Sequence, residues 1–482
     1  MVRRLTRILQ SAFFISLLAL TDVAAFLAAI AVAALLRAQI FTHLKWFRLE
    51  PVPLADQLRV GGPGAVFLLL VILAFEKLYT RRRAFWEEAR ALIKGATLTF
   101  VLIMTLVFLT RSYTFFSRAT IVLAWGLSLF LLPFGRLALK KLLKGSRVGR
   151  KSVLIIGTNS VAELLAKEIE KNDYLGYRVA GFLGARAMGD ERFVDEASVV
   201  GDLAELPAVV DRLGVRDVFI ALPNLSERDL FLTIRQSEMV VERIRIVSRV
   251  GSLYFMGLEV ESLGDVTSLA VACNMAKPWN VRIKHALSFL TALILAVGLA
   301  PLGLLIALAI RLDSRGPILF RQDRLGKNGV VFRFLKFRSM HVEGDRLLAA
   351  HLEAHPEARE QWARFQKLKG FDPRVTRVGR LLRRLSLDEL PQLLNVLSGD
   401  MDLVGPRPYL PREQELMGLA SPIITRVRPG ITGLWQVRGR NLLSFDRRLV
   451  LDEYYIRNWS LWLDIVILMK TVRVLARREG AF

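Results

Sequence analysis

Two adjacent carboxylates in the last quarter of the chain, Asp388 and Glu389, are the residues best placed for chemistry. Ser386 precedes Glu389 by the spacing of a helix capping box, and Pro391 is tolerated only in a first helical turn. The pattern predicts that a helix starts near 386–388, where the positive end of its dipole keeps both carboxylates ionised and attracts phosphate. Taken alone, the pair is better explained by plain helix capping than by a catalytic role.

Arginines surround this pair in the sequence. Arg383 and Arg384 lie just upstream, Arg407 lies in a Gly-Pro-Arg-Pro turn, and the run 428–441 adds guanidinium groups among glycines. Arginine forks match phosphate oxygens, and carboxylates among them can act as a nucleophile or as Mg2+ ligands. The pattern therefore indicates a site for a phosphorylated substrate. Nucleic-acid binding is the competing use, but aromatic residues for base stacking are sparse between positions 336 and 440.

The composition indicates a membrane portion joined to soluble portions. Apolar residues make up 53% of the 482 residues and charged residues 23%, and the net charge is +24. Such an excess of cations needs an anionic partner, such as nucleic acid, a lipid surface or a phosphorylated substrate. The single cysteine excludes an internal disulfide. His351 and His355 have helical spacing, but no third metal ligand is near them in the sequence.

Four apolar stretches predict membrane-spanning helices, at roughly 12–36, 62–78, 95–110 and 119–135. The Lys and Arg residues near their ends number sixteen on one side and six on the other. The positive-inside rule then places both ends of this bundle in the cytoplasm. We predict a four-helix transmembrane domain over residues 1–147 rather than a buried helical bundle of a soluble protein.

The following segment, 148–250, predicts a Rossmann-like α/β module. Apolar runs that indicate strands alternate with helical patterns, and this alternation is typical of a parallel, doubly wound sheet. The strands are expected at 152–156, 177–183, 217–222 and 244–247, with a helix at 161–170. Only Gly157 of the dinucleotide fingerprint is present, and no acid follows the second strand to bind a ribose. A structural or regulatory module is therefore favoured over an NAD site.

A fifth apolar stretch covers residues 286–310 and contains Pro301, which interrupts helical hydrogen bonding. Both of its flanks are basic, and a true span would export one of the two clusters. We therefore expect a broken, re-entrant helix that enters and leaves the membrane on the cytoplasmic side, with a straight fifth span as the alternative. A linker over 251–276 precedes it, and a mostly α-helical monotopic catalytic domain covers 277–482.

Several ordered motifs of the C-terminal region resemble one family. They are Asp313-Ser314-Arg315-Gly316-Pro317 with Gln322, Lys336-Phe337-Arg338-Ser339-Met340, Asp372-Pro373-Arg374-Val375-Thr376-Arg377, the Asp388-Glu389 run, Gly405-Pro406-Arg407-Pro408 and Arg428-Pro429-Gly430-Ile431-Thr432-Gly433. The region is similar to the catalytic domain of bacterial polyprenyl-phosphate hexose-1-phosphate transferases. The whole layout resembles the long members, notably the undecaprenyl-phosphate galactose phosphotransferases.

The resemblance implies a reaction in two steps. Asp388 would attack the β-phosphate of a UDP-sugar and release UMP, and undecaprenyl phosphate would then take the sugar phosphate from the enzyme. Glu389 would bind Mg2+ at the diphosphate. The product, undecaprenyl diphosphate-hexose, would begin the assembly of an O-antigen, capsule or exopolysaccharide. Galactose is the expected sugar and glucose the close alternative.

The resemblance also implies further site residues and a location. Lys336, Arg383, Arg407 and Arg440 would hold phosphate or nucleotide, and Asp464 would order the site unless it is only the polar face of an interfacial helix. The enzyme would lie in the bacterial inner membrane with its active site on the cytoplasmic face. We expect a homodimer and no nucleic-acid partner.

Two other functions compete with this interpretation. A membrane-anchored nucleotide-sugar dehydratase or epimerase would need the missing glycines and a Tyr-x-x-x-Lys pair, and no tyrosine of the chain has a lysine four residues on. A non-enzymatic scaffold for polysaccharide export would leave the carboxylates and their arginines unexplained.

Overall fold

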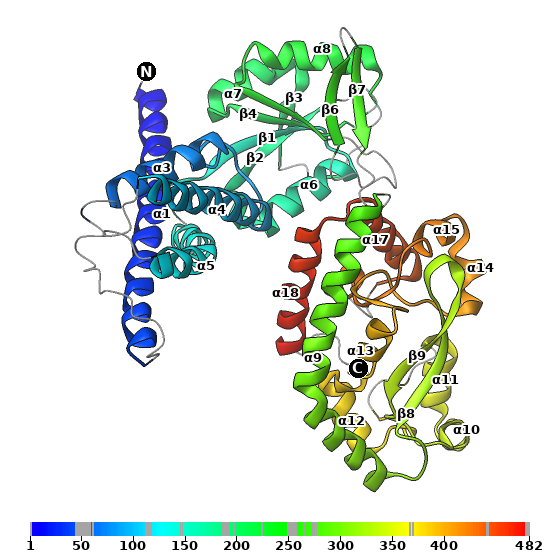
Figure 1. Cartoon of the computed structure of the whole chain (residues 1–482). Helices are drawn as coiled ribbons and strands as arrows, with labels where there is room; N and C mark the ends of the chain where they lie inside the picture. Colours follow the sequence, from blue (N-terminus) through cyan, green and yellow to red (C-terminus); the bar gives the residue numbers. More distant parts are fainter. Residues whose placement is uncertain are drawn as a thin grey trace. The chain divides into compact units, whose positions relative to one another are not determined.

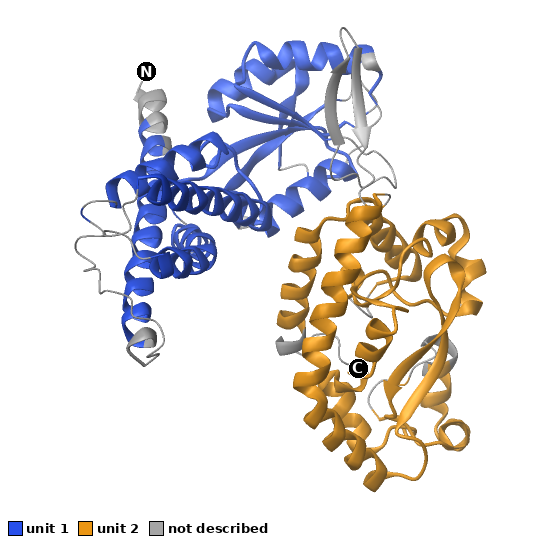
Figure 2. Cartoon of the chain, in the orientation of Figure 1, with its two compact units in different colours: residues 1–250 blue, residues 251–482 orange. Residues whose placement is uncertain are grey.

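The structure is a computed structural model. It describes residues 2–43, 59, 62–110, 118–144, 146, 148–185, 190, 193–195, 198–222, 225–247, 258–263, 266–271, 275, 277–365, 368, 371–439 and 443–477. The chain divides into two compact units, Met1–Val250 and Gly251–Phe482 (Figure 2). The predicted transmembrane domain and Rossmann-like module thus lie together in unit 1.

Apolar helices form the first part of unit 1: α1 (Val2–His43), the shorter α3 (Gly62–Phe75), α4 (Phe85–Leu109) and α5 (Arg118–Leu142). By length and composition α1, α4, α5 and α9 of unit 2 could each cross a membrane, and the chain is a membrane protein. A buried ion cluster joins three of these helices. The Arg136 guanidinium contacts Asp22 at 2.9 and 2.6 Å and Glu88 at 2.6 Å.

The α/β module contains a five-stranded parallel sheet with strand order β3-β2-β1-β4-β5. The strands are β1 (Lys151–Ile156), β2 (Tyr177–Gly184), β3 (Val199–Asp202), β4 (Asp217–Ile220) and β5 (Arg243–Ile246), and the helices are α6 (Ser160–Lys171), α7 (Leu206–Leu213) and α8 (Glu227–Glu238). The predicted parallel sheet is confirmed. The prediction missed β3, because this four-residue edge strand has too short a pattern to recognise.

Side-chain alternation along the strands produces one apolar core on each face of this sheet. Val153 and Ile155 pack with α6, while Leu154 and Ile156 pack with residues of α7. The module is also tied to the membrane helices, because the Arg82 guanidinium donates to the carbonyl oxygens of Gly149, Leu175 and Gly176 at 2.6, 2.9 and 3.0 Å. These contacts make unit 1 a single compact body.

Unit 2 begins with an antiparallel hairpin, β6 (Leu258–Leu263) and β7 (Val266–Val271), inside the predicted linker, and continues into α9 (Pro278–Asp313). A second hairpin follows, β8 (Leu319–Leu325) with β9 (Val331–Phe337), and a short parallel pair joins β10 (Asp402–Val404) to β11 (Gly430–Thr432). Its longer helices are α10 (Gly344–Ala354), α11 (Pro356–Phe365), α12 (Arg377–Leu385), α13 (Gln392–Leu397), α16 (Leu434–Arg438), α17 (Phe445–Arg457) and α18 (Leu461–Arg477). The predominance of helix agrees with the prediction for this domain.

Helix α9 is continuous across Pro301, so the predicted break in helical structure is wrong. A proline removes one main-chain hydrogen bond and bends a helix. The flanking turns keep their own hydrogen bonds, so the helix can continue. Figure 1 shows α9 as one long helix that changes direction along its course. Much of its surface is apolar and exposed, including Ile294 at 72% and Leu304 at 73%.

Candidate active site

The two carboxylates lie on a single 3-10 turn, Leu387–Glu389, between α12 and α13. The predicted capping box is absent, because Ser386 adopts a left-handed backbone (φ 54°) as the C-cap of α12 and its hydroxyl caps nothing. The following helix, α13, begins only after Pro391. The dyad is therefore positioned by the packing of this turn, and not at the first turn of an α-helix.

Two of the predicted cations meet the dyad. The Lys336 Nζ, at the end of β9, lies 2.8 Å from Glu389 Oε1 and 3.6 Å from Asp388 Oδ2. The positive charge of Arg383 lowers the pKa of Asp388, and the Arg383 Nε donates to Ser339 Oγ at 2.9 Å. Asp388 is buried, with 8% of its surface exposed. Water therefore screens the interaction of its charge with these cations only weakly.

Asn395 of α13 positions the strand that carries the lysine. Its side-chain oxygen accepts the Leu335 N–H at 3.0 Å, and its amide donates to the Arg333 carbonyl at 2.9 Å. The sequence predicts no role for Asn395, because an asparagine in a helix carries no signal of a distant strand. The contact fixes β9 against the dyad.

Burial raises the pKa of Asp388, with a smaller contribution from the neighbouring Glu389 charge, whereas Lys336 and Arg383 oppose the rise. The sequence predicted that a helix dipole keeps this carboxylate ionised, but α13 starts four residues further on. The two cations are the groups that stabilise its charged form. Lysine and arginine side chains can also bind phosphate oxygens.

The described residues contain no group of three or more His, Cys, Asp or Glu that could hold a metal ion. Asp388 and Glu389 nevertheless suit Mg2+, which commonly takes one or two protein carboxylates and completes its shell with phosphate oxygens and water. Glu389 Oε1 is paired with Lys336, and its second oxygen accepts no hydrogen bond from the described residues. The dyad therefore fits a metal that arrives with a diphosphate.

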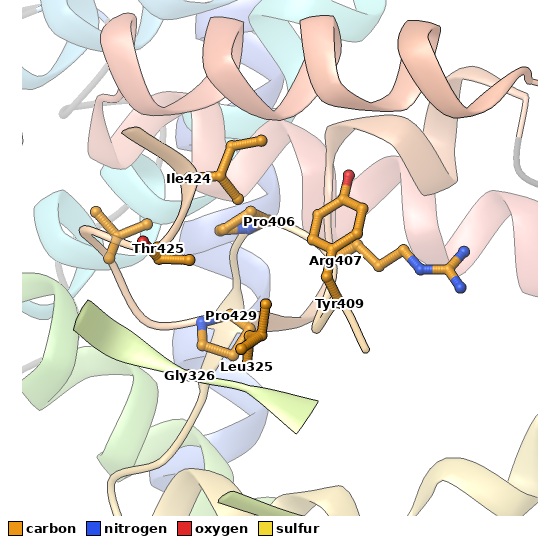
Figure 3. A pocket seen from close by; sticks show the side chains of 9 residues that line it. Leu325, Gly326, Pro406, Arg407, Tyr409, Ile424, Thr425 and Pro429 are labelled. Carbon is orange, nitrogen blue, oxygen red and sulfur yellow. The ribbon is translucent and has the colours of Figure 1, made fainter. Parts of the chain in front are cut away.

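Arg407 follows β10 on the Gly-Pro-Arg-Pro turn and lines a small pocket with Leu325, Tyr409 and Pro429. Figure 3 shows its side chain extending away from the other lining residues. Asp452 supports the turn. Its carboxylate accepts hydrogen bonds from the Arg407 N–H at 3.1 Å and from the Tyr409 hydroxyl at 2.9 Å. No contact joins Arg407 to the dyad, and Arg440 lies outside the described residues.

Asp464 is buried and accepts hydrogen bonds from three side chains. Its carboxylate accepts from Lys284 Nζ at 2.7 Å, from the Tyr455 hydroxyl at 2.6 Å and from Trp459 Nε1 at 3.0 Å. Lys284 also donates to the Val404 carbonyl at 2.8 Å. The cluster connects α9 and α18 to β10, the strand that leads into the Arg407 turn, so Asp464 is not the exposed polar face of an interfacial helix.

Comparison with known proteins decides the family. A model described as bacterial sugar transferase matches residues 279–478. The UDP-galactose-lipid carrier transferase of Erwinia amylovora is 33% identical, over 84% of this chain and 84% of that protein. The undecaprenyl-phosphate galactose phosphotransferase of Salmonella typhimurium is 32% identical over the same shares. The chain belongs to the bacterial sugar transferase family.

Other relatives match only part of this sugar transferase. The exopolysaccharide production protein ExoY of Rhizobium meliloti is 42% identical, over 43% of this chain and 91% of its own length. A model described as CoA-binding domain matches residues 78–248, which include the parallel sheet. The ExoY protein therefore lacks a counterpart to much of this chain.

The phosphate-binding position of the α/β module is filled by the transferase's own side chains. Asp190 accepts the Thr158 N–H at 2.7 Å and the Asn159 side-chain amide at 2.9 Å, and Asn159 in turn caps α6. Phosphates of a dinucleotide normally use the N–H groups at this point. The structural or regulatory role of the module stays a prediction.

Asp452 should make the stability of the transferase depend on pH. Burial raises its pKa to about 7, although the Arg407 N–H and the Tyr409 hydroxyl oppose the rise. The folded state thus holds the proton more tightly than the unfolded state, so the stabilisation is complete below the unfolded pKa and is lost as pH rises towards 7. Asp452→Asn cannot titrate and should lose less stability between pH 4.5 and 7.5.

The measurement is the thermal unfolding midpoint of the detergent-solubilised protein across that range. The difference between wild type and variant removes the contributions of all other titrating groups. Equal slopes for the two proteins would show that Asp452 has an ordinary pKa. Asp446→Asn, at an exposed position on the same helix, is the matched control.

Proposed function

We propose that this enzyme transfers a hexose-1-phosphate from a UDP-sugar to undecaprenyl phosphate through a phosphosugar bound to Asp388. Relatives named as undecaprenyl-phosphate galactose and glucose phosphotransferases support an undecaprenyl-phosphate sugar phosphotransferase. The observation that carries the proposal is the buried Asp388 carboxylate beside Glu389, with Lys336 at 3.6 Å. A carboxylate in this setting has cations to hold a phosphate against it.

In the first step an Asp388 oxygen attacks the β-phosphorus of the donor. The bond from that phosphorus to the oxygen bridging the two phosphates breaks, and UMP leaves with the bonding electron pair. Lys336 and Arg383 hold the Asp388 charge and the phosphate oxygens in place during the attack. In the second step an undecaprenyl phosphate oxygen attacks the same phosphorus, and the bond to Asp388 breaks.

Glu389 is the residue that would hold Mg2+ at the diphosphate. When bound, the ion would neutralise negative charge on the diphosphate and on the departing UMP. Lys336, which pairs with Glu389, would also neutralise part of the negative charge of the diphosphate. The homodimer and the assembly of a surface polysaccharide remain predictions about this enzyme.

The test is release of UMP from a panel of UDP-sugars by the purified protein. UDP-galactose or UDP-glucose should give UMP, EDTA should stop the release, and excess Mg2+ should restore it. Addition of undecaprenyl phosphate should convert a single turnover into many. Release of UDP in place of UMP would mean that the sugar moves without its phosphate, which contradicts the proposal.

We also infer that α9 is re-entrant. Near its start, Ser288 is buried with the Leu403 N–H at 3.4 Å from its hydroxyl, and near its end Ile306 and Ile310 pack with Phe337 and Leu382. Both ends of α9 therefore pack on the same unit, with exposed apolar residues between them. A helix that crossed the bilayer would place its two ends on opposite sides, away from any common domain.

Labelling of single cysteines tests this topology. Trp279→Cys and Arg315→Cys, each in a Cys273→Ser background, should both resist an impermeant thiol reagent in intact cells and react after permeabilisation. Arg48→Cys, which the charge rule places outside, is the positive control. Reaction of Arg315→Cys alone in intact cells would show that α9 spans the membrane.

A further inference from the structure

Gln392 carries a buried side-chain donor without a partner. The residue is 2% exposed, and its Nε2 has no hydrogen-bond acceptor within the described part of the chain. Most buried side-chain amides are hydrogen-bonded, because an N–H group that loses water without gaining an acceptor destabilises the fold. A catalytic role is one physical explanation for such a donor.

Gln392 follows the dyad on one helical path. The two residues between the 3-10 turn of the dyad and α13, Leu390 and Pro391, keep a right-handed helical backbone. Across this junction the Leu393 N–H donates to the Leu390 carbonyl at 3.1 Å. Positions four apart on a helical path are neighbours, so the side chains of Asp388 and Gln392 lie on adjacent turns.

Both neighbours of Gln392 on this path contact β9. Four positions before it, Asp388 Oδ2 lies 3.6 Å from Lys336 Nζ. Three positions after it, the side-chain oxygen of Asn395 accepts the Leu335 N–H at 3.0 Å. Gln392 lies between these two contacts and is buried with both residues, so it belongs to the side of the path that faces β9.

The Asp388 carboxyl group can accept a further hydrogen bond. It is buried and accepts from its own main-chain N–H, and Lys336 Nζ at 3.6 Å is too distant for a hydrogen bond. Asn395 is the other nearby amide, but its oxygen and nitrogen both bond to the main chain of β9. Gln392 is therefore the amide on this path that still has a donor to offer.

We propose that Gln392 is a positioning residue for Asp388, with its Nε2 donating in the reacting state to the carboxylate oxygen that does not attack the donor. That oxygen becomes the carbonyl oxygen of the acyl phosphate when the other oxygen bonds to phosphorus. The hydrogen bond fixes the rotation of the carboxylate, so the attacking oxygen faces the phosphorus. When the second step breaks the bond to Asp388, the same N–H stabilises the returning negative charge.

This inference rests on the proposed function, and its test is steady-state kinetics of the full-length protein in detergent with a UDP-sugar and undecaprenyl phosphate. Gln392→Met keeps the length of the side chain but has no N–H, so kcat should fall about tenfold or more while KM for the UDP-sugar changes less than about twofold. Its thermal midpoint should stay equal or rise, because the unpartnered donor is gone. Gln414→Met, at an exposed position of α14 (Gln414–Met417) in the same unit, is the matched control and should leave kcat unchanged.

Gln392→Glu gives a readout that a purely structural role would not produce. The introduced carboxyl group donates a hydrogen bond only when it is protonated, and it repels the Asp388 charge when it is ionised. Burial raises the pKa of such a group, so the protonated form is present at low pH and is lost as pH rises. The kcat of this variant relative to wild type should therefore increase as pH falls from about 8 to about 6.

The alternative results are separable. A Gln392→Met kcat within about twofold of wild type would contradict the inference, and so would a raised KM with unchanged kcat, which would place the amide on the substrate. A midpoint lowered as in Asn395→Leu, with a Gln392→Glu ratio independent of pH, would show a packing role only. If Gln392→Met does not fold, the pH dependence of Gln392→Glu decides. In all these cases the proposed function stands, whereas it fails if wild type releases no UMP from UDP-sugars.

Discussion

Asp388→Asn should abolish both UMP release and sugar-phosphate labelling of the protein when donor is supplied alone. The amide keeps the shape of the side chain but removes the charge and most of the nucleophilicity of its oxygen. Loss of an essential nucleophile costs on the order of 10^4-fold or more in turnover. The measurements are the rate of UMP release and the mass of the intact protein after incubation with a UDP-sugar.

Asp345→Asn is the matched control, because it removes an exposed carboxylate from α10 of the same unit and should leave both readouts unchanged. Residual activity of Asp388→Asn within about tenfold of wild type would exclude Asp388 as nucleophile. The other nearby acids are engaged elsewhere: Asp402 contacts His285 at 2.9 Å, and Asp400 accepts the Ser398 hydroxyl at 2.6 Å. Labelling of the Asp388→Asn protein would nevertheless make these two the next residues to test.

Lys284→Met should destabilise unit 2 strongly. Lys284 is 1% exposed and donates to Val404, Tyr455 and Asp464. Removing one partner of a buried ion pair leaves an uncompensated charge, here on Asp464, and typically costs about 3–5 kcal/mol. The midpoint of thermal unfolding should fall by several degrees, and activity should fall with it because β10 leads into the Arg407 turn.

Two comparisons separate the effect of losing the ion pair from the effect of losing one positive charge. Arg282→Met removes an exposed charge from the same part of α9 and should change the midpoint of thermal unfolding little. Lys284→Met combined with Asp464→Leu removes both charges and should recover part of the lost stability. A Lys284→Met midpoint equal to that of Arg282→Met would show that the pair contributes nothing to stability.

Local patterns were sufficient for the elements that a short stretch of sequence specifies. The run at 152–156 followed by Gly157 predicted β1, and the helical pattern at 161–170 predicted α6, which spans Ser160–Lys171. Hydrophobic periodicity and turn residues act over a few residues, so they can be read without the fold. Motif resemblance likewise identified Asp388, Glu389 and Lys336 together.

Contacts between distant residues were decided by the tertiary structure. Lys284 and Asp464 are 180 positions apart, and only the packing of α9 on α18 brings the charges together. The sequence predicted a capping box at Ser386, but this residue ends α12 in a left-handed conformation. Pro301 predicted a break in a helix that in fact continues.

The sequence by itself thus determined which residues carry charge, which stretches are apolar and where the adjacent carboxylates Asp388 and Glu389 stand in the chain. The tertiary structure decided what surrounds each charge: Lys336 beside the dyad, Lys284 against Asp464, and Arg407 over the Trp435 ring. The physical reason is that burial and pairing depend on long-range packing, whereas charge and hydropathy belong to each residue. Two aspartates of the same unit therefore have different surroundings, Asp388 beside Lys336 and Glu389 and Asp464 in a buried hydrogen-bonded cluster.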